Sequence, residues 1–178
     1  MEEGIYANLE TSKGLIVIVL EYEKTPGTVG NFISLAEGKI KNSYKDIGKP
    51  YFDGLSFHRV INNFMIQGGG HYSDMSEAKE RGTIVNEADN GLKNRKGTIA
   101  MARMNPIDSA GRQFFINTKN NGFLDHSARS CSREAEAKNA ELRAQGRHKP
   151  QTCKSFGYAV FGKVIEGMDV VDLIELSD

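Results

Sequence analysis

One stretch of this chain places a single cation beside apolar side chains and an amide. Residues 57–70 read FHRVINNFMIQGGG, with Arg59 near the start, apolar residues in the middle and Gln67 before three glycines. Neighbouring side chains on a strand point to opposite faces, so His58 and Arg59 cannot both face the core. We expect His58 to pack inward as a hydrogen-bonded structural histidine. Arg59 would then face a groove, where its guanidinium stays charged and offers fixed donors.

A second stretch contains the same residue types. Residues 112–118 read RQFFINT, which on a strand puts Gln113 and Phe115 on one face and Phe114 and Ile116 on the other. This strand therefore offers another glutamine and another phenylalanine to the same groove.

The sequence lacks the signatures of several other chemistries. It contains no GxSxG, HExxH or P-loop motif and no GxGxxG followed by a helix. The glycines at 68–70 lead into polar sequence, so they do not predict a phosphate cradle. None of the four histidines has an obvious nucleophile beside it, which argues against a nucleophilic hydrolase.

Composition limits the size and the partners. A chain of 178 residues with 39% hydrophobic residues can bury one good core, so we expect a single domain over residues 1–178. Lysine plus arginine equals aspartate plus glutamate at 23 each, which leaves no net field to attract nucleic acid or a membrane. The longest apolar run, Leu15 to Leu20, is far shorter than the roughly 20 residues of a spanning helix. We expect a cytoplasmic monomer, or a periplasmic or secreted protein after removal of a signal peptide.

Hydrophobic alternation predicts a mainly β fold. Residues 5–11 and 14–22 form an expected hairpin, and Thr25 and Pro26 begin a helix that ends near Gly38. We expect the sheet to close on itself, with helices covering its ends. Further strands are expected at 97–103, 112–118 and 156–165, and a last helix at 168–176.

One segment differs from the rest of the chain. Residues 127–155 are rich in Ala, Glu, Lys, Arg and Gln and contain almost no large apolar residue besides Leu142. Glu134 precedes Lys138 by four residues, a spacing that supports an exposed helix. The segment predicts a polar, helical insertion.

Two cysteines and two histidines raise the question of a metal. His126-x4-Cys131 is echoed by His148-x4-Cys153, and four such ligands could build a tetrahedral zinc site. These spacings are looser than a CxxC pair. A disulfide between Cys131 and Cys153, or two free thiols, is therefore favoured, and we expect no metal.

The chain closely resembles the cyclophilins, above all their bacterial members, in seven ordered stretches: FHRVI, FMIQGG, NEADNGL, GTIAMAR, SAGRQFFIN, FLDH and FGYAVFGKVIEGMDVVD. The resemblance runs from about Ile5 to Asp172, excluding residues 39–50 and the segment 127–155. It implies an antiparallel barrel of eight strands capped by two helices, and peptidyl-prolyl cis/trans isomerisation without metal or cofactor. The chain stops at Asp178, where the family continues into a final strand, so we expect that strand to be missing.

The resemblance also implies site residues. Arg59 matches the catalytic arginine, and two positions depart from eukaryotic members, with Phe123 in place of a tryptophan and Tyr158 in place of a histidine. The usual Pro-Gly of the first stretch is Asn62-Asn63, which can still turn because Asn tolerates left-handed backbone. The implied substrate-binding residues are Phe64, Met65, Gln67, Ala102, Arg103, Gln113, Phe115, Phe123, Leu124 and Tyr158.

The implied partners are proline-containing peptides and unfolded or flexible protein segments. Weak cyclosporin binding is expected, because Phe123 lacks the indole N–H that helps to bind it. Arg112 stands where many relatives have a small residue at a secondary pocket, and its bulk and charge are expected to narrow the side chains accepted upstream of the proline.

Two alternatives to a catalytic isomerase remain at this point. The groove could hold proline peptides with little turnover, or the fold could be a scaffold whose insertion docks a partner protein. In the scaffold alternative, deletion of residues 130–154 would abolish partner binding and leave isomerase activity intact.

Overall fold

A computed structural model of the chain describes residues 3–39, 48–78, 82–127, 132–146 and 156–177. The described part is mainly β, as predicted. Seven of its strands form one antiparallel sheet in the order β1-β2-β9-β7-β8-β5-β4, and β3 pairs with β6 in a second, small sheet. The strands are β1 (Ile5–Thr11), β2 (Gly14–Leu20), β3 (Leu55–Ser56), β4 (Arg59–Ile61), β5 (Met65–Gly68), β6 (His71–Tyr72), β7 (Thr98–Met101), β8 (Phe114–Asn117) and β9 (Val160–Glu166).

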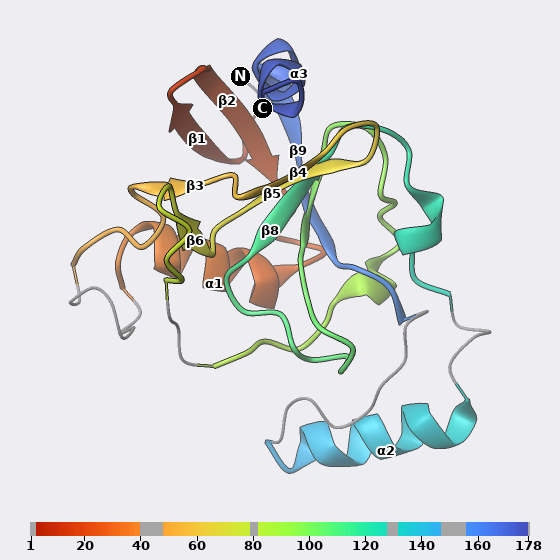
Figure 1. Ribbon diagram of the computed structural model, residues 1–178. Coiled ribbons are helices and arrows are strands. Elements are labelled where there is room, and N and C mark those ends of the chain that lie inside the picture. Colours follow the sequence, from red (N-terminus) through yellow and green to blue (C-terminus); the bar gives the residue numbers. More distant parts are fainter. Residues whose placement is uncertain (1–2, 40–47, 79–81, 128–131, 147–155, 178) are drawn as a thin grey trace.

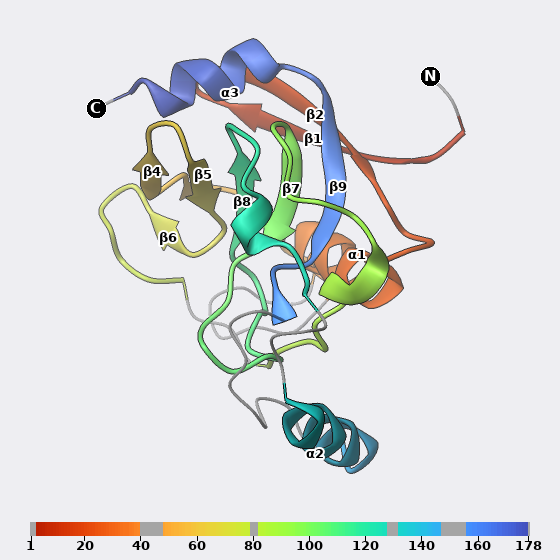
Figure 2. The same cartoon turned by 90° about the vertical axis from the view of Figure 1, so that its right-hand side faces the viewer.

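In the described part of the chain, three α-helices and two short 3₁₀ helices accompany the sheet. In the two perpendicular views α3 lies at the top of the molecule, α1 lies lower against the strands, and α2 lies at the bottom (Figures 1 and 2). None of the helices in the described part of the chain is long and apolar enough to cross a membrane. The helices are α1 (Pro26–Ala36), η1 (Ala88–Asn90), η2 (Gly122–Leu124), α2 (Arg133–Ala144) and α3 (Met168–Glu175).

The first hairpin forms as the alternating pattern predicts. Its register runs from Ile5 opposite Leu20 to Thr11 opposite Gly14, so the turn has only two residues. The Thr11 hydroxyl donates to the Gly14 carbonyl at 2.7 Å and closes that turn. The second strand ends at Leu20, two residues before the predicted end.

The stretch that contains Arg59 folds as a tight hairpin of β4 and β5. Arg59 lies directly opposite Gln67 in this pair. Asn63 has a φ of +57°, so the Asn62-Asn63 turn uses the left-handed backbone that asparagine tolerates. The Asn63 N–H also donates to Glu175 Oε1 on α3 at 2.7 Å, which ties the turn to the last helix.

Helix α1 begins at the predicted place, but a different group caps it. The Thr25 hydroxyl donates to the Glu21 carbonyl at 2.9 Å and makes no cap hydrogen bond to the helix. The Glu87 carboxylate instead accepts from the Thr28 N–H at 2.6 Å. A carboxylate is favourable there because the first amides of a helix lack partners and carry partial positive charge.

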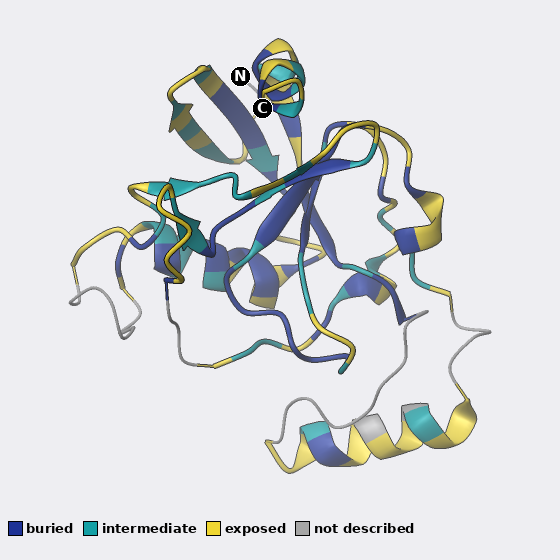
Figure 3. Ribbon diagram, viewed as in Figure 1, coloured by how far each residue is buried: buried dark blue, intermediate teal, exposed yellow. Residues whose placement is uncertain are grey.

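The two faces of the sheet bury different sets of side chains. Alternate residues of β5, β7 and β8 face the main core, which also contains the buried sides of α1 and α3. The intervening residues form a second cluster on the other face, and this cluster becomes one wall of the groove described below. On these strands the first set is Ile66, Ile99, Met101, Phe114 and Ile116, and the second is Met65, Ala100 and Phe115. Strands β5 and β8 are themselves mostly buried (Figure 3).

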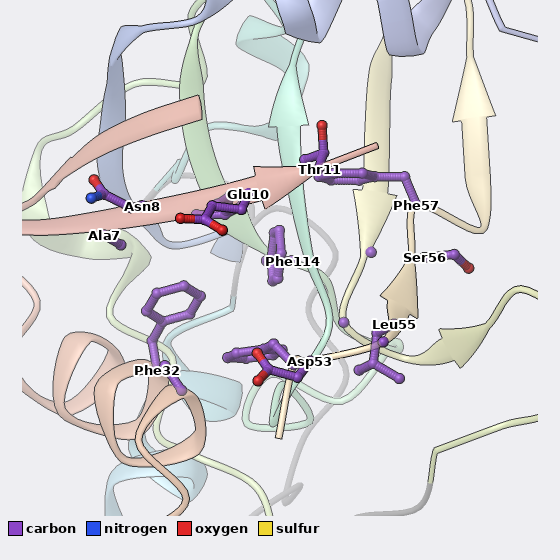
Figure 4. Close-up of a pocket in the computed structure, with 16 residues that line it drawn as sticks. Ala7, Asn8, Glu10, Thr11, Phe32, Asp53, Leu55, Ser56, Phe57 and Phe114 are labelled. Carbon is purple, nitrogen blue, oxygen red and sulfur yellow. The ribbon is translucent and has the colours of Figure 1, made fainter. Parts of the chain in front are cut away.

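The sheet curls into a half-barrel with β1 and β4 at its edges. The predicted mainly β fold is confirmed as a half-barrel, and no described strand joins β1 to the far edge. A hollow of about 520 Å³ lies beside β1, where aromatic rings and two carboxylates face it (Figure 4). The rings belong to Phe32, Phe52, Phe57 and Phe114, and the carboxylates to Glu10 and Asp53.

The polar segment contains the predicted helix, over Arg133–Ala144. The Ser132 hydroxyl caps it by accepting from the Ala135 N–H at 3.1 Å. Most of α2 is exposed, but Leu142 is buried. That the segment is an insertion stays a prediction. Cys131, His148 and Cys153 lie outside the described residues.

Candidate functional site

A groove of about 160 Å³ brings the two stretches together. Of the eleven residues that the sequence predicted for the site, nine line this groove. Gln113 and Phe123 do not line it, although both contact residues that do. The nine are Arg59, Phe64, Met65, Gln67, Ala102, Arg103, Phe115, Leu124 and Tyr158.

Two glutamines hold Arg59 in place at the mouth of the groove. Arg59 Nη1 donates to Gln67 Oε1 at 3.3 Å, and Gln67 Nε2 donates to Gln113 Oε1 at 2.7 Å. Gln113 therefore lies behind Gln67 and acts on the guanidinium only through it. Gly70 makes room for this arrangement, because a Cβ there would meet the Gln113 side chain at 2.5 Å.

The wall opposite the cation is apolar and well packed. Met65, Phe115 and Leu124 are buried together in the second cluster of the sheet. Tyr158 packs edge-on against Phe115, with ring centroids 5.9 Å apart. A small apolar ring could pack on this preformed surface. The side chains of the wall are already packed, so they would lose little conformational entropy when a ligand binds.

Phe123 stands at the rim of the groove. Its side chain is 75% exposed, and its ring stacks on Phe64 with centroids 5.7 Å apart. Phe64 lines the groove and Phe123 does not, so Phe123 is joined to the groove through its stacking on Phe64.

A second guanidinium, that of Arg103, lies along the groove and is tied to backbone carbonyls. Arg103 Nε donates to the Gly157 carbonyl at 2.9 Å, and Nη1 donates to the Met104 carbonyl at 2.9 Å. The guanidinium also lies 4.8 Å from the centre of the Tyr158 ring. Burial lowers the pKa of Arg103, but a guanidinium stays protonated in proteins.

His58 is half-buried beside Arg59, so the predicted inward packing is only partial. Its ring lies against His71, with centroids 4.2 Å apart. Burial lowers the pKa of His58, the neighbouring His71 lowers it further, and a side-chain hydrogen bond with Gln113 acts in the opposite direction. The expected hydrogen bonding is incomplete, because Nδ1 of His58 is buried without a partner among the described residues.

Arg112 is buried beside the groove instead of standing free at a pocket mouth. Its Nη2 donates to Glu77 Oε1 at 2.6 Å, and its Nη1 donates to the Tyr51 hydroxyl at 3.3 Å. It lines a second hollow of about 370 Å³, which shares Gln67 and Arg103 with the groove.

Sequence reasoning missed three residues that support the groove. Asn86 donates from its side chain to the Gly157 carbonyl at 3.1 Å, and its N–H donates to Asp108 Oδ1 at 2.8 Å. Asn86 and Gly157 are 71 positions apart, so no local pattern could have joined them. All three lie in or beside the stretches NEADNGL, SAGRQFFIN and FGYAVFG.

The described residues bring together no group of three or more His, Cys, Asp or Glu side chains that could hold a metal. His126, the one ligand of the proposed zinc pattern among them, has its Nδ1 2.7 Å from the Phe156 carbonyl. The other three lie outside the described residues.

The chain matches known proteins along most of its length. The model of the family described as cyclophilin type peptidyl-prolyl cis-trans isomerase/CLD matches residues 6–178. The chain is 41% identical over 166 residues to peptidyl-prolyl cis-trans isomerase A of Dickeya dadantii, covering 93% of this chain and 68% of that one. It is 42% identical over 167 residues to peptidyl-prolyl cis-trans isomerase cyp18 of Streptomyces antibioticus, covering 94% and 81%.

A solved structure has a similar fold. A cyclophilin type peptidyl-prolyl cis-trans isomerase of Cryptosporidium parvum, crystallised in the presence of the dipeptide Ala-Pro, matches with a TM-score of 0.66. The match covers 98% of this chain and 87% of that one at 21% sequence identity.

Proposed function

The chain belongs to the cyclophilin-type peptidyl-prolyl cis-trans isomerases, and we propose that it catalyses rotation about X-Pro bonds at the groove beside Arg59. The reaction is a rotation about an amide bond, so it makes and breaks no covalent bond. The observation that carries the assignment of the site is the position of the Arg59 guanidinium beside the apolar wall of the groove.

The chemistry follows from the nature of the amide. Nitrogen lone-pair density is shared with the carbonyl, which gives a barrier of about 18–20 kcal/mol to rotation. Twisting the bond localises that lone pair on the proline nitrogen. Arg59 can then donate to the nitrogen in the twisted state and much less in the planar one, so it stabilises the transition state selectively.

The surroundings of Arg59 make this interaction effective. Gln67, held by Gln113, limits the directions in which the guanidinium can point. The apolar wall of Met65, Phe115 and Leu124 seats the proline ring and lowers the local dielectric, which strengthens a charge-assisted hydrogen bond.

One hydrogen bond does not account for the whole reaction. A rate gain of about 10⁵ would require about 7 kcal/mol off the barrier, which exceeds the contribution of a single donor. The strand end at Ala102 and Arg103 would hold the residues that flank the proline, and the energy of that binding would supply the rest.

The substrates we propose are proline-containing peptides and unfolded or flexible protein segments. The groove has a volume of about 160 Å³ and an apolar wall, a size that suits one ring of an extended chain better than a folded surface. The Cryptosporidium relative, solved in the presence of Ala-Pro, supports a ligand of this class. We also propose that the enzyme acts as a single-domain monomer in the cytoplasm.

A short Ala-Pro peptide followed by exchange NMR tests the proposal directly. The folded protein should accelerate cis/trans exchange of the peptide at substoichiometric concentration. If the folded protein gives no acceleration, the groove is at most a binding site.

Arg112→Ala is expected to broaden the side chains accepted upstream of the proline. The substitution removes a buried guanidinium from the wall of the second hollow and leaves Glu77 there without its partner. Turnover of a peptide library that varies the upstream positions would measure the change. Identical profiles for the variant and the wild type would show that Arg112 does not affect selectivity.

Cyclosporin is expected to inhibit the wild type only weakly. Phe123 presents an exposed ring without an N–H at the rim of the groove. Phe123→Trp should strengthen inhibition about tenfold, the effect of one added hydrogen bond. Inhibition of the wild type at nanomolar concentrations would contradict this expectation.

A further inference from the structure

Helix α2 is anchored to the rest of the protein through one buried charge. It lies apart from the sheet in both views (Figures 1 and 2). Arg143 near the end of the helix nevertheless reaches Asp108. Arg143 Nε donates to Asp108 Oδ2 at 2.9 Å, and Nη2 donates to Oδ1 at 2.7 Å. The Asp108 side chain is fully buried, so this two-point contact supplies the counterion that a buried carboxylate needs.

The same guanidinium also holds the backbone of Asn86. Arg143 Nη2 donates to the Asn86 carbonyl at 3.3 Å, while the Asn86 N–H donates to Asp108 Oδ1 at 2.8 Å. The three residues therefore form a closed polar cluster in which each contacts the other two. The hydrogen bonds that Arg143 donates to Asp108 raise the pKa of Arg143, as expected for a cation paired in this way.

This cluster is joined to the groove by one carbonyl oxygen. The Gly157 carbonyl accepts from the Asn86 side chain at 3.1 Å and from Arg103 Nε at 2.9 Å. Arg103 lies over the ring of Tyr158, and both residues line the groove. A shift of Asn86 would thus change the acceptor that orients Arg103.

We propose that Arg143 is a positioning residue for the isomerase reaction, holding Asp108 and Asn86 so that Gly157 keeps Arg103 and Tyr158 in place along the groove. This inference rests on the proposed function of the groove. It gives the polar segment a role within the enzyme itself.

Loss of the guanidinium would leave the Asp108 carboxylate buried without a counterion, which is strongly unfavourable. The carboxylate would have to take up a proton or draw in water, and the loop that contains Asn86 would have to move with it. Deletion of residues 130–154 would remove Arg143 as well. Such a deletion should therefore weaken substrate binding, in contrast to the scaffold alternative.

The first variant to compare with the wild type is Arg143→Gln, in kinetics on an Ala-Pro peptide. KM should rise about tenfold with kcat changed less than twofold, because Arg103 and Tyr158 would contact the flanking residues and not the rotating bond. The matched control is Lys138→Gln on the same helix, which removes an exposed pair with Glu141 and should leave both constants unchanged.

Two further variants separate positioning from a purely structural role. Arg143→Lys keeps the charge that Asp108 needs, so the protein should fold. A single ammonium cannot reproduce the planar two-point contact, so KM should still rise about threefold. The double variant Arg143→Gln with Asp108→Asn removes the orphan charge. Its unfolding free energy should recover while its KM stays raised.

The Arg103 Nε–H resonance gives an independent readout in the folded state. It should move in each Arg143 variant and stay in place in Lys138→Gln. An unchanged KM and an unmoved resonance in folded Arg143→Lys and in the double variant would overturn the inference. A wild type that does not accelerate exchange would instead refute the proposed function, and the resonance would still report whether Arg143 positions Arg103.

Discussion

Arg59→Ala is expected to lower kcat/KM for an Ala-Pro peptide by about 10²–10³, the usual effect of removing one donor that acts on the transition state. The loss should appear mainly in kcat, because the planar ground state makes little use of the guanidinium. Arg59 is exposed, and within the described part of the chain its guanidinium donates to Gln67 Oε1, so the circular dichroism spectrum should not change. Exchange NMR at matched protein concentrations measures the effect.

Two controls make the Arg59 result specific. Arg59→Lys keeps the charge but loses the planar fork that Gln67 holds, so it should recover only part of the activity. Arg95→Ala removes another exposed guanidinium and should leave kcat/KM within about twofold. If a folded Arg59→Ala protein keeps full activity, the proposed mechanism is wrong.

Gly157→Ala is expected to lower the free energy of unfolding by about 2–5 kcal/mol. Gly157 has a φ of +93°, which strains any residue with a Cβ. An added Cβ would also meet the His126 nitrogen at 2.6 Å and the Asp125 carbonyl carbon at 2.8 Å. These are backbone atoms, so the clash can be relieved only by moving the chain. Urea denaturation followed by circular dichroism would measure the loss.

Gly91→Ala separates the two contributions at Gly157. Gly91 has nearly the same φ, +86°, but an added Cβ there would have no neighbour within 4 Å. It should therefore show only the backbone strain of about 1–2 kcal/mol. If both variants lose the same unfolding free energy, the backbone around Gly157 moves to relieve the steric clash without a measurable loss of stability.

Much of the fold follows from local patterns in the sequence. Alternation over residues 5–11, a turn at 12–14 and an apolar run from Gly14 predicted the first hairpin, and a strand with one buried face tolerates only one register. Opposite directions of neighbouring side chains also placed His58 inward and Arg59 outward. Strand alternation and the family resemblance together predicted which residue types line the groove.

The tertiary structure corrected the sequence-based predictions where two interacting residues are distant in the chain. The cap of α1 comes from Glu87, about 60 positions away, although Thr25 has the right residue type for that role. The sequence of helix α2 predicts a solvated surface helix. Only the folded structure shows that Arg143 on this helix pairs with the buried Asp108.

The sequence by itself determined most of the longer strands, the buried face of some of them and which side chains are available for catalysis, since these depend on periodicity within a few residues. Only the tertiary structure decided how far the sheet curls, that Gln113 lies behind Gln67, and that one carbonyl oxygen joins Asn86 to Arg103. The physical reason is that buried polar groups take whichever partner the folded chain brings near, and that partner leaves no periodic trace in the sequence.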